Sequence, residues 1–312
     1  MRKFLCAVIA AALFYAGALA ESGDFRAGAD AAKLGGSLFF AVDEGATGAL
    51  VRVGETPMLA ARAEKIASLL VFDGDLYYLA ETDGAWALMR REETTAPETV
   101  YAFDAGTDVR ALSAYGSELF LLVDGRLHIV YPEQALCLRL AGAQMHEYTV
   151  DGEYAYFVSA ADLVDYELPS GAGTASAEAG CLYKLNLSTG NTSLVMKAGA
   201  ENLTMRGGKL YFHNLSDAYL QGTEKVAGRL YSLDIAEETL TRELDCYDWA
   251  YCAARDGILV YRQGGVNLVS SGGSEINVCV TGTRALVSFA DGFVFVYDPD
   301  ETTFTCFSVP VP

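Results

Sequence analysis

One short phrase recurs along the whole chain, and it restricts the fold more than any other feature. The phrase is a turn containing Gly, followed by an apolar run rich in Tyr, Phe, Val and Leu with a period of two. That period is typical of a half-buried β-strand, and Gly and Asp supply the turn conformations before it. Copies occupy residues 35–40, 73–79, 116–121, 151–157, 207–212 and 256–261, with a degenerate copy at 283–289.

A second phrase, Gly followed by alternating apolar residues, comes after most copies of the first, and the two together predict a hairpin. It occupies residues 84–90, 125–130, 180–186, 228–234 and 292–298. One anchor residue from each first phrase gives Leu38, Leu76, Leu119, Tyr154, Leu210, Leu259 and Leu286, about 41 residues apart on average. Four-stranded propeller blades have this length. The sequence therefore predicts an all-β chain, a β-propeller of about seven four-stranded blades; a two-sheet sandwich would not require seven repeats.

The pattern D-G-x-L-Y-Y followed by G-x-L-Y-x-L-D resembles secreted bacterial β-propeller repeat proteins of the TolB-like or YWTD-like kind. The resemblance implies a propeller that binds a ligand or a protein, and it transfers no catalytic residue. The chain departs from several propeller families, since it has no W-D blade ending, no Y-W-T-D run and no sialidase-type Asp box. Many propellers join their chain ends in one blade, and residues 21–33 are expected to add a strand to the last blade.

The N-terminus is typical of an export signal. Arg2 and Lys3 precede an apolar stretch, and Ala18-Leu19-Ala20 offers small residues to a signal peptidase. We expect residues 1–20 to be removed and residues 21–312 to form a single propeller domain, secreted or otherwise extracytoplasmic. An uncleaved membrane anchor is the alternative, although the apolar stretch is short for a spanning helix.

Acidic residues outnumber basic ones. The chain holds 41 Asp and Glu against 22 Lys and Arg, so the formal net charge of −19 becomes −21 once Arg2 and Lys3 are removed. Such a field repels nucleic acids and anionic membranes. We therefore expect no nucleic-acid partner and no membrane contact after signal cleavage. We also expect the chain to be a monomer with a protein or glycan partner.

The repeat alignment bears on the six cysteines that remain after cleavage. An even count is compatible with disulfides. Seven residues before the anchors lie Ala31, Leu69, Leu112, Glu147, Leu203, Cys252 and Cys279, which we assign to the innermost strands. Cys packs there as a small hydrophobe in place of Leu. Cys252 and Cys279 are thus predicted to be buried free thiols; a disulfide is the alternative, with Cys246–Cys252 the first pair to test.

Glu147 interrupts this apolar set and has two interpretations. Its carboxylate points at the central channel beside His146, or a one-residue register shift turns Tyr148 inward instead. The register shift is favoured.

Two units carry long insertions between their two phrases, at residues 159–179 and 213–227. A propeller places the equivalent loops of consecutive blades side by side on one face, and long loops on a rigid scaffold often carry function. Tolerated surface insertion is the equal alternative. The predicted binding residues are Asp162, Asp165, Tyr166, His213, Asp217 and Tyr219.

No catalytic constellation emerges from the sequence. G-x-S-x-G is absent, the three histidines have no metal-ligand spacing, and Asp43-Glu44-Gly45 is interpreted as a turn rather than a calcium loop. No cofactor and no metal are expected. The sequence favours an exported, non-enzymatic binding or scaffold propeller acting on proteins or glycans at the cell surface. The alternative is an exported carbohydrate- or peptide-processing enzyme with its site in the channel, which clustered channel carboxylates would favour.

Overall fold

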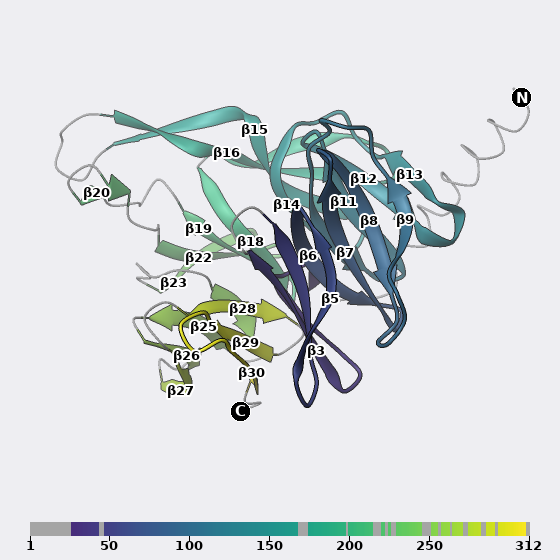
Figure 1. Ribbon diagram of the computed structural model, residues 1–312. Coiled ribbons are helices and arrows are strands. Elements are labelled where there is room, and N and C mark those ends of the chain that lie inside the picture. The colour runs from purple at the N-terminus through teal and green to yellow at the C-terminus, as the bar shows by residue number, and fades with distance from the viewer. Residues whose placement is uncertain are drawn as a thin grey trace, which may run out of the picture.

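The computed structural model describes residues 26–309, except 44–46, 168–173, 198, 215–219, 222–223, 226–228, 245–250, 255–256, 263, 271–273, 282–284 and 291–292. The predicted signal peptide, residues 1–20, lies outside this part. Antiparallel sheets follow one another along the chain and form a ring of seven blades (Figure 1). Over the described residues, no helix has both the length and the apolar character needed to cross a membrane.

The strands of each blade follow chain order from the central channel outward. Blade 1 comprises β2 (Ala31–Leu34), β3 (Ser37–Asp43), β4 (Gly48–Val53) and β5 (Pro57–Ala63). Blade 2 comprises β6 (Lys65–Phe72), β7 (Asp75–Thr82), β8 (Ala85–Arg91) and β9 (Glu98–Ala102). Blade 3 comprises β10 (Val109–Tyr115), β11 (Glu118–Val123), β12 (Arg126–Tyr131) and β13 (Leu136–Arg139), with a 3₁₀ turn, η2 (Pro132–Gln134), before β13.

The second half of the ring follows the same order. Blade 4 comprises β14 (Met145–Asp151), β15 (Tyr154–Glu167), β16 (Thr174–Asn186) and β17 (Thr192–Met196). Blade 5 comprises β18 (Ala200–Arg206), β19 (Lys209–Asn214), β22 (Arg229–Asp234) and β23 (Thr239–Leu244); a small ribbon, β20 (Leu220–Gln221) with β21 (Glu224–Lys225), is inserted between β19 and β22. Blade 6 comprises β24 (Tyr251–Ala254), β25 (Gly257–Arg262), β26 (Gly265–Ser270) and β27 (Glu275–Val280), and blade 7 comprises β28 (Leu286–Ala290), β29 (Phe293–Asp298) and β30 (Thr303–Ser308).

The recurring sequence phrase is the link between the first and second strands. Two residues make this link in every blade. Gly74 and Gly152 occupy it in blades 2 and 4 with φ of +84° and +56°, a backbone region that glycine adopts without steric cost. The predicted all-β, seven-bladed propeller is confirmed.

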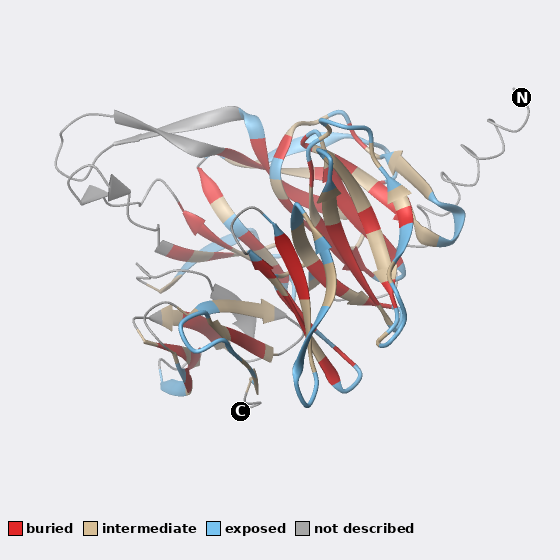
Figure 2. Ribbon diagram, in the orientation of Figure 1, coloured by how far each residue is buried: buried red, intermediate tan, exposed pale blue. Residues whose placement is uncertain are grey.

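Neighbouring blades pack face to face because alternate residues of a strand point to opposite sides of its sheet. Phe39 packs with Leu69 of blade 2, whereas the next residue, Phe40, packs with Phe295 of blade 7. Buried clusters of this kind occupy all seven interfaces, including the closing one between blades 7 and 1. Burial concentrates in the middle of the strands, and the connecting turns are exposed (Figure 2). The core is therefore a ring of interfaces rather than one central cluster.

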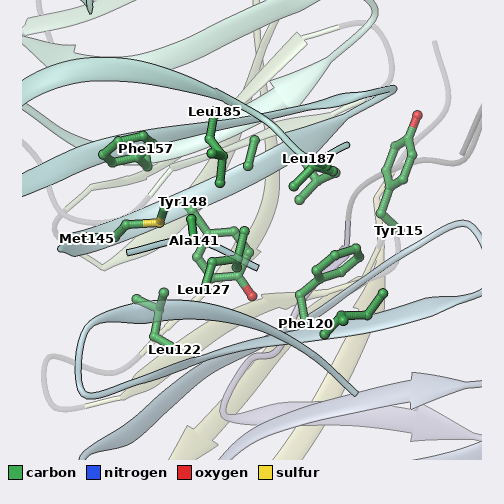
Figure 3. Packing of buried hydrophobic residues seen from close by; sticks show 13 residues of the cluster. Tyr115, Phe120, Leu122, Leu127, Ala141, Met145, Tyr148, Phe157, Leu185 and Leu187 are labelled. Carbon is green, nitrogen blue, oxygen red and sulfur yellow. The ribbon is translucent and has the colours of Figure 1, made fainter. Parts of the chain in front are cut away.

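The interface between blades 3 and 4 illustrates this packing (Figure 3). Phe120 of blade 3 meets Tyr148 and Phe157 of blade 4. The Tyr148 hydroxyl lies 2.8 Å from the Ala111 carbonyl and 2.7 Å from Ser113 Oγ. A buried phenol needs such partners, and here both come from the innermost strand of the adjacent blade.

A bulge recurs in the innermost strands of blades 2 to 5. Strand pairing shifts between Ala67 and Leu70, Arg110 and Ser113, Met145 and Glu147, and Glu201 and Thr204. In three of these strands a non-glycine residue has a left-handed φ: Ser68 (+55°), Ala111 (+55°) and Asn202 (+58°). A bulge leaves backbone groups without ladder partners, so these strands present free N–H and C=O groups.

Residues 26–30, here called the strap, bind these groups in blades 2 and 3. β1 (Arg26–Ala27) adds a fifth strand along the channel side of β10. The Gly28 N–H donates to the Leu112 carbonyl at 2.7 Å, and Ala29 and Leu69 exchange two hydrogen bonds of 3.0 and 2.7 Å. The expectation that residues 21–33 complete the last blade is wrong over its described part. Since the strap continues directly into β2 at residue 31, it cannot reach the outer edge of blade 7.

Blade 7 has three strands in the described part, and its true anchor differs from the predicted one. The two-residue link precedes β29, so the equivalent of Leu259 is Phe295, 36 residues later, and Leu286 lies in the first strand. Cys279 accordingly lies in β27, the fourth strand of blade 6, and not in an innermost strand. The degenerate phrase before residue 290 caused the wrong assignment.

The thiol prediction is confirmed for Cys279, which is buried and free. Cys137 and Cys306 are also free thiols. The Cys252 side chain and Cys246 lie outside the described part, so their state stays a prediction.

Candidate binding face

The second and third strands of each blade are joined at one end of the ring, which we call the insertion face. The start of each first strand reaches the same face, because the first two strands are antiparallel; in blade 1, Ala31 pairs with Phe40. In blades 2 and 3 this junction is a two-residue turn, Asp83-Gly84 and Asp124-Gly125, with positive φ at all four positions. Such Asp-Gly turns match the twist of the strands they join.

The first predicted insertion, residues 159–179, is largely an extension of a hairpin rather than a loop. β15 and β16 contain 14 and 13 residues and remain paired out to Glu167 and Thr174 (Figure 1). Asp162, Asp165 and Tyr166 all lie in β15, although their side chains are outside the described part. A paired ribbon keeps its backbone bonds internal, so the described part of this insertion is a β-hairpin rather than an irregular loop.

The second predicted insertion lies at the same junction of the next blade and contains the β20–β21 ribbon. Asp217 and Tyr219 lie outside the described residues. His213 does not belong to an exposed surface, since it is 1% exposed within β19. Its Nδ1 lies 3.1 Å from the Asn202 amide nitrogen, and burial lowers its pKa to about 4. The ring is therefore neutral at physiological pH and belongs to the interior of the blade.

Glu147 lies beside the same region, between blades 4 and 5. The bulge in β14 produces the favoured register shift, and Tyr148 is buried as that interpretation requires. The Glu147 carboxyl accepts hydrogen bonds from the backbone of Leu203 and Asn202. Burial raises its pKa to about 7, and no described residue forms a hydrogen bond with its Oε1. The carboxyl thus binds the bulged backbone of blade 5, as Ala29 of the strap does in blade 2.

A pocket of about 350 Å³ opens where blades 7, 1 and 2 meet. Its lining comes from residues near the ends of strands that reach the insertion face. Phe40 and Phe295 are buried in its wall, and Trp86 and Tyr297 add two further aromatic side chains. The volume lies at the lower end of the range for small-ligand sites.

The polar lining of this pocket is mainly acidic. Asp30, Asp43 and Glu64 contribute carboxylates, and Lys65 contributes an ammonium group. Lys65 is engaged by Glu81, with Nζ 3.2 Å from Oε2, and its side chain is 70% exposed. Glu64 Oε2 accepts a hydrogen bond from the Gly84 N–H at 3.1 Å. Burial raises the pKa of Asp30, which is the last residue of the strap.

Sequence reasoning missed this pocket because its residues are far apart in the chain and none carries a motif. Asp30 precedes Ala31, the predicted innermost residue, and Trp86 lies in a predicted third strand. The available signal was positional: in a propeller, residues at the starts of first strands and the ends of second strands meet on one face. The extra length of the insertions instead favoured a binding site on blades 4 and 5. Among the described residues no group of three potential ligands could hold a metal ion.

Comparisons with known proteins identify the fold. No family model matches the chain, and no curated protein matches it. The WD40 domain of Pan2 from Neurospora crassa is similar, with a TM-score of 0.58 and 12% identity, over 91% of this chain and 90% of that one. The polysaccharide lyase Uly1 gives a TM-score of 0.54 and 12% identity, over 89% and 86%.

Two further solved structures are similar to the chain. The propeller domain of the Trilobed protease from Pyrococcus furiosus, described as having an open velcro topology, gives a TM-score of 0.53 and 10% identity, over 93% of this chain and 96% of that one. TolB from Acinetobacter baumannii gives a TM-score of 0.46 and 11% identity; the match covers 76% of this chain and 61% of TolB's length. The three likenesses with TM-scores above 0.5 establish a β-propeller fold, and at these identities they leave the function open.

Proposed function

We propose that this chain is an exported, non-enzymatic binding propeller whose protein partner docks on the insertion face, across residues 159–179 and 213–227. One observation carries the proposal: two neighbouring blades extend the same strand junction that blades 2 and 3 close with two residues. Adjacent extensions on a rigid ring enlarge one surface, and such surfaces are where scaffolds carry recognition.

Export is supported by the N-terminal sequence, and a protein partner fits the construction of the face. The hairpin of β15 and β16 keeps its backbone paired, so it loses less conformational entropy on binding than an irregular loop would. Tyr166 and Tyr219 supply side chains of the kind that anchor protein interfaces. Asp162, Asp165 and Asp217 would form the polar rim.

The chain itself provides the design for a test. Residues 161–179 are replaced by Asp-Gly, the turn of blades 2 and 3, so that Ala160 and Gly180 become the closing pair. Residues 215–228 are replaced in the same way, which preserves the pairing of Asn214 with Arg229. Because both cuts leave the buried clusters intact, the melting temperature should change by less than about 3 °C.

Immobilised mature chain is then exposed to an extract of envelope proteins. We expect partners captured by the wild type to be lost from the doubly shortened variant, with each single variant intermediate. Equal capture by the wild type and the doubly shortened variant would place the docking surface elsewhere. A matched control carries Asp104→Asn, an exposed charge change outside the insertions, and should capture as the wild type does.

A further inference from the structure

The pocket between blades 7, 1 and 2 faces the same end of the ring as the insertions, but it lies on the other side of the ring from blades 4 and 5. Ser288 and Tyr297 come from blade 7, Phe40 from blade 1 and Trp86 from blade 2. The strap enters it through Asp30, whose N–H donates to Ser288 Oγ at 3.2 Å and whose carbonyl accepts from the Ala41 N–H at 2.8 Å. The backbone of Asp30 is thus fixed from two blades.

The carboxylate of Asp30, unlike its backbone, is not held by neighbouring described residues. No described residue donates a hydrogen bond to it or forms an ion pair with it, and burial raises its pKa. The cation in the pocket lining, Lys65, is already paired with Glu81 and extends into solvent. Asp30 is exposed as a whole residue, and its carboxylate lines the pocket together with Asp43 and Glu64. This acidic lining makes the pocket electrostatically complementary to a positively charged group.

The remaining walls suit the rest of such a ligand. Phe40 and Phe295 provide an apolar wall, with ring centroids 6.0 Å apart. Trp86 and Tyr297 also line the pocket, and Trp is the side chain that attracts cations most strongly. An aliphatic stem ending in a cation matches both kinds of surface, whereas a neutral sugar would leave the Asp30 carboxylate without a counter-charge.

We propose that this pocket binds the cationic end of a lysine or arginine side chain presented by the docked protein. Asp30 receives the charged group, and the four aromatic residues contain its stem. The inference rests on the proposed binding function and adds the chemistry of the partner: a protein with an exposed basic residue. The net charge of −19 favours the approach of such a partner.

The test uses blocked amino acids as probes of the mature protein. Nα-acetyl-lysine N-methylamide and the corresponding arginine compound supply the cation; the norleucine compound has a similar stem without it. The chain contains two tryptophans, so the indole N–H signal of Trp86 in a nitrogen–proton correlation spectrum is assigned with Trp86→Phe and reports occupancy. Asp30→Asn preserves both backbone bonds of the strap, and Asp104→Asn is the charge-matched control.

We expect both cationic probes to shift the Trp86 signal with millimolar affinity and norleucine to leave it unchanged. Asp30→Asn should weaken binding about fivefold or more, as loss of a charge-assisted hydrogen bond does, while Asp104→Asn has no effect. Equal shifts by norleucine, insensitivity to Asp30→Asn, or a shift by cellotriose but not by the cations would overturn the proposal. If the probes do not bind while the shortened insertions still abolish capture, the pocket proposal alone is wrong. If the probes bind at Asp30 while the shortened variant captures as the wild type does, the proposed docking surface alone is wrong.

Discussion

Replacing Gly28 in the strap by alanine tests how the ring is held together. A Cβ at this position would lie 2.8 Å from the carbonyl oxygens of both Leu112 and Ser68. Both contacts are with backbone atoms of inner strands, so neither can be relieved by rotating a side chain. The strap must therefore move away from blades 2 and 3, or those strands must shift.

The hydrogen bonds of the strap indicate how much free energy of unfolding Gly28→Ala can remove. Four hydrogen bonds fix residues 26–29 to blades 2 and 3 beyond the short β1 pairing: one from Gly28 to Leu112, two between Ala29 and Leu69, and one from the Arg26 guanidinium to the Val71 carbonyl. At about 1 kcal/mol each, loss of these four bonds costs about 4 kcal/mol. Overpacking a rigid site usually costs about 1–3 kcal/mol. We expect Gly28→Ala to lower the free energy of unfolding by about 2–3 kcal/mol and the melting temperature by about 5 °C.

Urea unfolding measures the loss, and hydrogen exchange locates it. The Leu69 and Ala29 amides should lose protection, while amides in the outer strands of blades 4 to 6 should not. Gly54→Ala is the matched control, since a Cβ there meets nothing within 4 Å and its φ is not left-handed. If Gly28→Ala is as stable as Gly54→Ala, the strap contributes nothing to stability and the reasoning is wrong.

Three further predictions follow from the same structure. Phe40→Ala should cost about 3–5 kcal/mol in urea unfolding, as much as Phe120→Ala, because packing closes the ring at blades 7 and 1; a cost below 1 kcal/mol would contradict this. Burial and Glu201 raise the Glu147 pKa from 4.5 to about 7, so the folded chain retains a proton there and loses stability as pH rises across that window. Glu147→Gln should therefore be about 2 kcal/mol more stable than wild type at pH 8 and equal to it near pH 4. In the described part of the chain, β30 is the outer strand of blade 7 and carries no charge; Thr305→Lys in this strand should reduce light scattering on heating without changing the melting temperature.

The fold was predictable because the repeat encodes its own local structure. The Gly-containing link and the strand after it recur with the length of a blade, and alternation such as Phe39-Phe40 already implies two packed faces. The assignment of strands within the last blade was not predictable from the sequence. Two phrases of similar composition, at residues 283–289 and 292–298, contain β28 and β29, and only strand pairing distinguishes Leu286 in a first strand from Val294 in a second.

The candidate sites were harder to predict from the sequence than the fold, for a physical reason. The insertions are visible as extra length, but their conformation as a paired ribbon depends on a register that composition does not specify. His213 was assigned to the surface because polar residues usually lie there; its partner Asn202 is available only because β18 is bulged. The pocket around Asp30 depends on the strap, and the strap depends on bulges that no residue type signals.

The strap connects the stability of the ring to the pocket. Asp30 ends the strap and bonds to Ser288 of blade 7, so a ligand held by its carboxylate also holds the strap against the closing interface. A probe that binds only the folded chain stabilises it by about 1.4 kcal/mol at ten times its dissociation constant. If that site is the pocket, the blocked lysine should slow hydrogen exchange at Ala29 and Leu69 in the wild type and leave it unchanged in Asp30→Asn. Slower exchange in both proteins would show that the probe acts elsewhere and that strap and pocket are not coupled.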